Sequence, residues 1–301
     1  MCAIDSISAN FQKYNNYYLS GSPMFTTPVA SQPAISQPVM TKPAVYYKEP
    51  NTENAIIGAG ILQIIAMAVN KLSEKCGQML MRGKEFATPE QVKTIAEGMI
   101  NNKKYNDLHN SVDYKFVDTN NVREVAKNFR HISPNLGEAL DPVVKGQNAF
   151  FIAGNSAGKG LAVAPKTKSS LILHELGHAV HSHKNGIMKL LQNSRRIVPY
   201  VPTALLLLNG LTPDKTEGQN FIERNAGKLG FLAFLPTIIE EGMASLKGIK
   251  AAKNASKTLG KLNLKPLIKN YGLAWMTYVL AGVGLGIAAK QTFISGKNEN
   301  K

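Results

Sequence analysis

Residues 171–178 read LILHELGH and place the motif H-E-x-x-H inside an apolar run. Residues four apart lie on one face of an α-helix, so His174 and His178 can direct two imidazoles at one metal ion. Glu175 follows the first histidine, where its carboxylate can reach a metal-bound water. The pattern predicts a helix over residues 169–182 that carries two zinc ligands and a general base. The alternative is an ordinary helix with two half-buried histidines.

The surroundings of this motif indicate how the helix begins and packs. Hydroxyl side chains within residues 167–170 are expected to supply the capping groups at its start. Gly177 has no side chain beyond its hydrogen, so we expect a neighbouring element to pack closely against the helix there.

Composition limits the partners of the chain. Its 301 residues are enough for a sizeable core in one or two domains, and 35 Lys+Arg against 20 Asp+Glu give a net charge of +15. Such a balance favours attraction to anionic lipid or nucleic acid. The lysines are spread along the chain and no nucleic-acid recognition motif accompanies them. We therefore expect membrane lipid as a partner and no nucleic acid.

The sequence divides into four regions. Residues 1–54 are rich in Pro, Ser and Gln and are expected to be disordered, and residues 55–87 form an apolar helix followed by a basic linker. Residues 88–269 are expected to hold the metal-binding domain, interrupted by a hydrophobic hairpin at 197–239. Residues 270–301 are expected to form a C-terminal hydrophobic helix and a polar tail.

Short patterns before the motif predict a mixture of helices and strands. Residues 88–91 read TPEQ, which is typical of a capped helix start, and alternation over 112–118 predicts a strand. Residues 122–129 are expected to form a short helix. Residues 148–153 and 160–164 predict two strands joined as a hairpin. The fold class is therefore α+β and mostly helical.

Long uncharged segments indicate a membrane. Residues 270–289 contain 20 uncharged residues, enough to cross a hydrocarbon core of about 30 Å. Residues 55–70 and the two apolar parts of the 197–239 hairpin are shorter. Buried helices of a large soluble core are the alternative. The uncharged segments therefore lead us to expect a membrane protein. Lysine and arginine crowd the flanks of these segments, so by the positive-inside tendency we expect the flanks and the motif helix to face the cytoplasm.

Two histidines do not complete a zinc site, since a catalytic zinc ion takes three protein ligands. A third histidine on the same helix would need Gly and His where this chain has His181 and Lys184. His181 lies too far along the helix for the same ion and is expected to support the site or face solvent. Glu240 and Glu241 follow an apolar run and are the remaining candidates. The alternative is that both are solvated and paired with nearby lysines.

The chain resembles the gluzincin metallopeptidases of the HtpX and CAAX-prenyl-protease family. The resemblance rests on HELGH at 174–178, on EGMA at 241–244, where the family has E-x-x-A-D, and on NAF at 148–150. A hydrophobic hairpin between the histidines and the glutamate is a further similarity. Together these features cover residues 145–248. Ser245 departs from the family, which has an aspartate there.

The resemblance implies a zincin-like fold with hydrophobic, membrane-inserted helices. It also implies that the protein is a zinc-dependent endopeptidase, which hydrolyses a polypeptide substrate. One zinc ion per chain is then held by His174, His178 and Glu241, with Glu175 as the general base. The residues Asn148, Ala149 and Phe150 would lead into an edge strand to which an extended substrate adds. Two other functions remain open: a catalytically inactive membrane scaffold of the same fold, and a basic membrane protein that binds anionic lipid.

Overall fold

The computed structural model describes residues 52–105, 108–156, 158–184, 186–211, 220–291 and 293. This part of the chain is mostly helical with a small sheet, which confirms the coarse fold class. The helices are α2 Thr52–Met81, α3 Pro89–Ile100, α4 Leu108–Ser111, α5 Val122–Asn128, α6 Leu136–Val144, α7 Leu171–His183, α8 Ile187–Ser194, α9 Val201–Leu211, α10 Phe221–Ala255 and α11 Lys265–Gln291. The strands are β1 Val112–Val117, β2 Phe150–Ile152 and β3 Gly160–Pro165. The expected disorder of residues 1–54 falls almost entirely outside the described residues.

The sheet has the strand order β1-β3-β2. β1 runs parallel to β3, with Val112 opposite Gly160, and β2 runs antiparallel to β3, with Phe150 opposite Val163. The predicted strand at 112–118 and the predicted hairpin are therefore confirmed. Every residue of the central strand β3 is buried, whereas β2 lies at an edge of the sheet as described.

Helices cover both faces of this sheet. One apolar cluster joins Ala162 and Ala164 of β3 to α3 and α7, and a second joins Leu161 and Val163 to α5 and α6. Alternate residues of a strand point to opposite faces, which explains the division. The capping box that begins α3 at Thr88 and the short helix α5 were predicted, whereas α6 was not.

The motif helix α7 is buried from Leu171 to His181. Its N-terminal end corrects one expectation, because the hydroxyl of Ser170 does not cap it. The carboxylate of Glu85 instead accepts hydrogen bonds from Ser170 N at 2.9 Å and Ser170 Oγ at 3.1 Å. A negative charge at this position also complements the positive end of the helix dipole.

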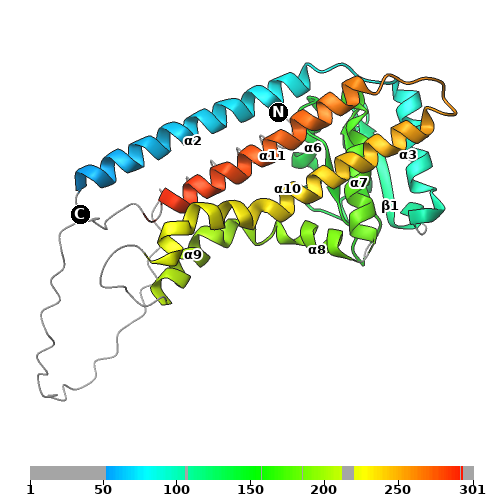
Figure 1. Ribbon diagram of the computed structural model, residues 1–301. Helices are drawn as coiled ribbons and strands as arrows, with labels where there is room; N and C mark the ends of the chain where they lie inside the picture. The colour runs from blue at the N-terminus through cyan, green and yellow to red at the C-terminus, as the bar shows by residue number, and fades with distance from the viewer. Residues whose placement is uncertain are drawn as a thin grey trace, which may run out of the picture.

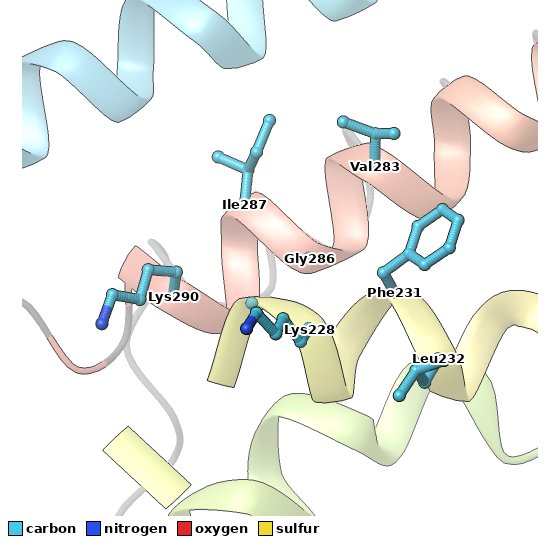
Figure 2. A pocket seen from close by; sticks show the side chains of 8 residues that line it. Lys228, Phe231, Leu232, Val283, Gly286, Ile287 and Lys290 are labelled. Atoms are coloured by element: carbon cyan, nitrogen blue, oxygen red, sulfur yellow. The ribbon is translucent and has the colours of Figure 1, made fainter. Parts of the chain in front are cut away.

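The long helices α10 and α11 lie side by side and antiparallel, and α2 runs along α11 (Figure 1). Both α10 and α11 are long and apolar enough to cross a membrane. The apolar segment 229–239 is not a separate arm, since it lies within α10, which also carries Glu241 and continues to Ala255. The expected boundary at 269/270 likewise falls inside α11. Between α10 and α11, near one end of the pair, lies an open groove (Figure 2).

Candidate metal centre

The centre forms where α7 crosses α10 at very short range. A methyl group at Gly177 would lie 2.5 Å from the carbonyl oxygen of Ala244, and one at Gly248 would lie 3.0 Å from that of Leu173. These two glycines allow the backbones to approach, as the sequence predicted for Gly177. The crossing places the histidines of α7 against the acidic residues of α10.

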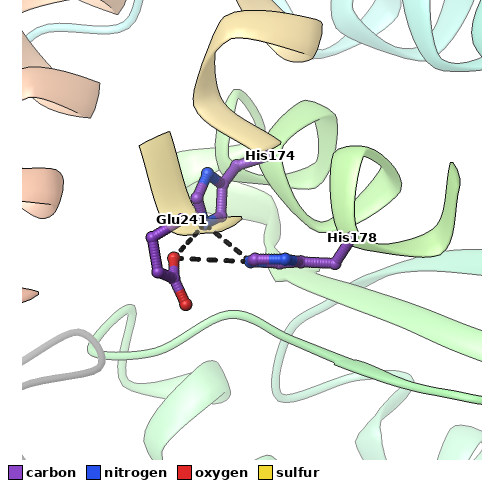
Figure 3. A group of neighbouring side chains, drawn as sticks. All are labelled: His174, His178 and Glu241. Atoms are coloured by element: carbon purple, nitrogen blue, oxygen red, sulfur yellow. Dashed lines mark hydrogen bonds and ion pairs between the residues drawn. The ribbon is translucent and has the colours of Figure 1, made fainter. Parts of the chain in front are cut away.

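Three expected ligands come together at this crossing (Figure 3). The Nε2 atom of His174 lies 3.0 Å from Nε2 of His178 and 3.1 Å from Oε2 of Glu241, and His178 Nε2 lies 3.4 Å from the same oxygen. Ligands 2.0–2.1 Å from a tetrahedral zinc ion are roughly 3.3 Å apart. The three atoms are therefore close enough to one another to hold a metal ion.

The outer ring nitrogens show why these atoms fit a cation. His178 Nδ1 lies 2.8 Å from Oε1 of Glu240, and His174 Nδ1 lies 3.0 Å from Oγ of Ser245. A carboxylate only accepts hydrogen bonds, so His178 carries its proton on Nδ1 and presents a lone pair at Nε2. The hydroxyl of Ser245 can accept from His174 Nδ1 in the same way, and in that tautomer three lone pairs converge at His174 Nε2, His178 Nε2 and Glu241 Oε2. A metal ion would satisfy all three.

Glu240 contacts the histidines on the side away from the three converging atoms. It is fully buried, and its Oε1 lies 2.8 Å from Nδ1 of both His178 and His181. Burial, followed by the charge of Lys247, lowers the pKa of His181 to about 3, so this imidazole is neutral and donates. Glu240 is thus neither the third ligand nor a solvated surface residue, and the lysine-paired alternative is wrong for both glutamates.

Arg195, just after α8, pairs with both acidic residues. Its Nη2 contacts Glu240 Oε2 and lies 2.7 Å from Glu241 Oε1. Burial is the largest single effect and lowers the pKa of Arg195, but Glu241, Tyr278 and Glu175 together outweigh it, so the pKa is raised. His178, His181 and Glu240 form a second close His/Glu group. Glu240 Oε1 contacts Nδ1 of both histidines of that group, so we expect the group to hold His178 in position.

The expected general base, Glu175, is buried beside the three ligands but is not one of them. Burial raises the pKa of its carboxyl, and the nearby charges of His174 and His178 oppose that shift. A raised pKa is common for a carboxylate that exchanges protons during catalysis. The role of Glu175 remains a prediction.

The expected substrate-binding residues lie at the start of the edge strand β2. Asn148 and Ala149 directly precede β2 and Phe150 begins it, while β2 lies alongside α7. Ala149 packs with the cluster that contains α7, whereas Phe150 packs on the opposite face of the sheet. The edge strand is therefore beside the motif helix, and its substrate role remains a prediction.

Sequence reasoning missed two residues of the centre. In the sequence, Arg195 is one of the basic residues beside a hydrophobic segment, and Glu240 is an alternative to Glu241 as the third ligand. The adjacent pair of acidic residues after an apolar run was the available signal for Glu240. No local pattern identifies Arg195, because its position depends on how α8 packs against α10.

Comparisons of the chain with protein-family models, with curated proteins and with solved structures find no match. The case for a function therefore rests on the residues and geometry of this chain.

Proposed function

We propose that this protein is a membrane-associated, zinc-dependent endopeptidase that hydrolyses polypeptides. The observation that carries the proposal is the convergence of His174 Nε2, His178 Nε2 and Glu241 Oε2 within 3.4 Å of one another, beside a buried Glu175. A structural zinc site generally has four protein ligands, whereas a catalytic one has three and keeps a position for water. Three ligands beside an additional carboxylate favour the catalytic kind.

Each side chain then has a distinct task. Bound zinc would lower the pKa of a coordinated water towards about 7 and so supply a nucleophile at neutral pH. Glu175 accepts the proton of the attacking water and returns it to the leaving amine. Glu240 and Ser245 hold the two imidazoles in the tautomer that keeps Nε2 free. The edge strand β2 aligns the substrate through main-chain hydrogen bonds.

The spacing of lysines supports membrane insertion of α10 and α11. Lys228 and Lys247 are separated by about 28 Å along α10, and Lys269 and Lys290 by about 32 Å along α11, at 1.5 Å per residue. Gly227 packs at Gly286 and Gly248 packs at Tyr271, so these lysines lie in two level pairs. Their separation matches the thickness of a bilayer core, about 30 Å.

The exposed surface between the two lysine pairs also supports membrane insertion of α10 and α11. Only 39% and 33% of the most apolar windows of α10 and α11 are buried, which is low for core helices of a soluble protein. Large apolar side chains such as Leu232, Ile239 and Leu246 are exposed there. Glu241 lies six residues from Lys247, about 9 Å inside that end, so we place the metal centre near the Lys247/Lys269 end of the helix pair.

The test is cleavage of casein by the full chain in detergent. We expect wild-type activity that o-phenanthroline abolishes and added zinc restores, and a Glu175→Gln variant that keeps its zinc but loses at least about a hundredfold in rate. Zinc-loaded wild type without cleavage of casein or of an unfolded membrane protein would instead support an inactive scaffold. Protein that binds no zinc would leave a basic membrane protein that binds anionic lipid.

A further inference from the structure

A groove between α10 and α11 lies far from the metal centre, near the Lys228/Lys290 end of the helix pair (Figure 2). Its volume is about 550 Å³, and its walls are almost entirely apolar. The apolar walls come from Phe231 and Leu232 of α10 and from Val283 and Ile287 of α11. The groove is open along one side, so a long ligand could enter it laterally.

Two glycines form the floor of this groove. A methyl group on Gly286 would lie 2.7 Å from the carbonyl oxygen of Gly227, so the two backbones pack closely there. The missing side chains leave space above the crossing, between the larger residues on either side. The hollow therefore follows from the packing of the pair.

Lys228 and Lys290 both line the same end of the groove, as Figure 2 shows. Lys290 Nζ donates a hydrogen bond to the carbonyl oxygen of Glu223 at 3.0 Å. This bond fixes the position of the ammonium group, and because a carbonyl oxygen carries no net charge, the bond does not neutralise the lysine. The ammonium group can still donate two hydrogen bonds. The groove thus joins a doubly positive end to a long apolar wall.

We propose that this groove binds one anionic phospholipid, with its phosphate between Lys228 and Lys290 and one acyl chain along Phe231, Val283 and Ile287. The complementarity is twofold: two positive charges meet a negative headgroup, and an apolar channel meets a hydrocarbon chain. The proposal rests on the membrane insertion proposed above, which sets the two lysines at the level of lipid headgroups. It is independent of zinc and of peptide hydrolysis.

The test is native mass spectrometry of the full chain released from detergent and titrated with phosphatidylglycerol, with phosphatidylcholine of the same chains, and with glycerol phosphate. We expect one phosphatidylglycerol to bind more tightly than phosphatidylcholine, and glycerol phosphate not to bind. In the double variant Lys228→Gln/Lys290→Gln, affinity for phosphatidylglycerol should fall about 30-fold, since each lysine at an anionic lipid contributes about fivefold. Affinity for phosphatidylcholine should not change.

Two further variants separate this site from general attraction to charge. Lys253→Gln/Lys257→Gln removes the same charge from two exposed positions, one in the last turn of α10 and one just after it, and should leave the first bound lipid unaffected. Val283→Trp fills the groove, keeps both lysines and should weaken binding of both lipids. Equal binding of the two lipids, an equal loss in the control, or binding of glycerol phosphate as tight as that of the lipid would overturn the proposal.

Failure of this site is distinguishable from failure of membrane insertion. Extraction of cell membranes with alkaline carbonate reports insertion alone. A chain that stays in the membrane but shows no preference for the anionic lipid refutes only the groove. A chain released by carbonate refutes the insertion on which the groove depends.

Discussion

The substitution Gly177→Ala tests whether the close crossing of α7 and α10 builds the metal centre. An added methyl group would lie 2.5 Å from the carbonyl oxygen and 2.8 Å from the Cα atom of Ala244, where ordinary contacts are 3.4–4 Å. Both neighbouring atoms belong to the backbone, so no side chain can rotate away. The two helices must separate by about 1 Å.

That displacement is large for a metal site. Ligand distances at a zinc ion tolerate changes of about 0.2 Å, so moving Glu241 about 1 Å from the two histidines should abolish tight binding. Overpacking of this kind typically destabilises by about 1–3 kcal/mol. In an unobstructed helix the same change stabilises by about 0.5–1 kcal/mol, because alanine is the better helix former. A loss of stability in Gly177→Ala therefore indicates a close backbone crossing, whereas a gain indicates an unobstructed helix.

The assay is thermal unfolding of the purified variant, together with its zinc content after exchange against a weak chelator. Gly98→Ala is the matched control, because Gly98 lies in α3 with nothing within 4 Å of the added methyl group. We expect Gly98→Ala to keep its zinc and its stability or gain slightly, and Gly177→Ala to lose both. A Gly177→Ala protein that is more stable and fully zinc-loaded would refute the reasoning.

Three further substitutions test the residues around the ligands. Glu240→Gln should weaken zinc affinity about 10- to 100-fold in a chelator competition, because it removes the carboxylate behind His178; Glu223→Gln, a buried glutamate elsewhere on α10, should not. Ser245→Ala removes the hydrogen-bond partner of His174 Nδ1 and should weaken zinc affinity about tenfold, and an unchanged affinity would argue against that role. Arg195→Gln leaves two buried carboxylates without their cation, so the zinc-free protein should lose more melting temperature than the zinc-loaded one; equal losses would contradict the electrostatic role.

The sequence predicted the elements whose signals are local. Periodicity and a capping box located α3, the H-E-x-x-H spacing in an apolar run located the motif helix, alternation located β1, and a turn-rich connection located the β2–β3 hairpin. The spacing of His174 and His178 depends only on helix geometry, so it was readable in advance. Gly177 was also readable, because a glycine in an apolar helix face favours close packing.

The remaining features depend on contacts between distant segments. Glu85 caps α7 from 85 residues away, and Arg195 reaches Glu240 and Glu241 only because α8 packs against α10. Pro236 lies inside α10, and the helix continues through it to Ala255. Tertiary packing decided each of these points, and no single window of sequence contains the information.

The most direct test of the central claim is zinc stoichiometry, measured by elemental analysis on the purified full chain and on Glu241→Gln beside Glu223→Gln. The account predicts one zinc ion per chain in the wild type and in Glu223→Gln, and almost none in Glu241→Gln after the same exchange. Wild-type protein without zinc, or Glu241→Gln with a full equivalent, would contradict a centre built from His174, His178 and Glu241.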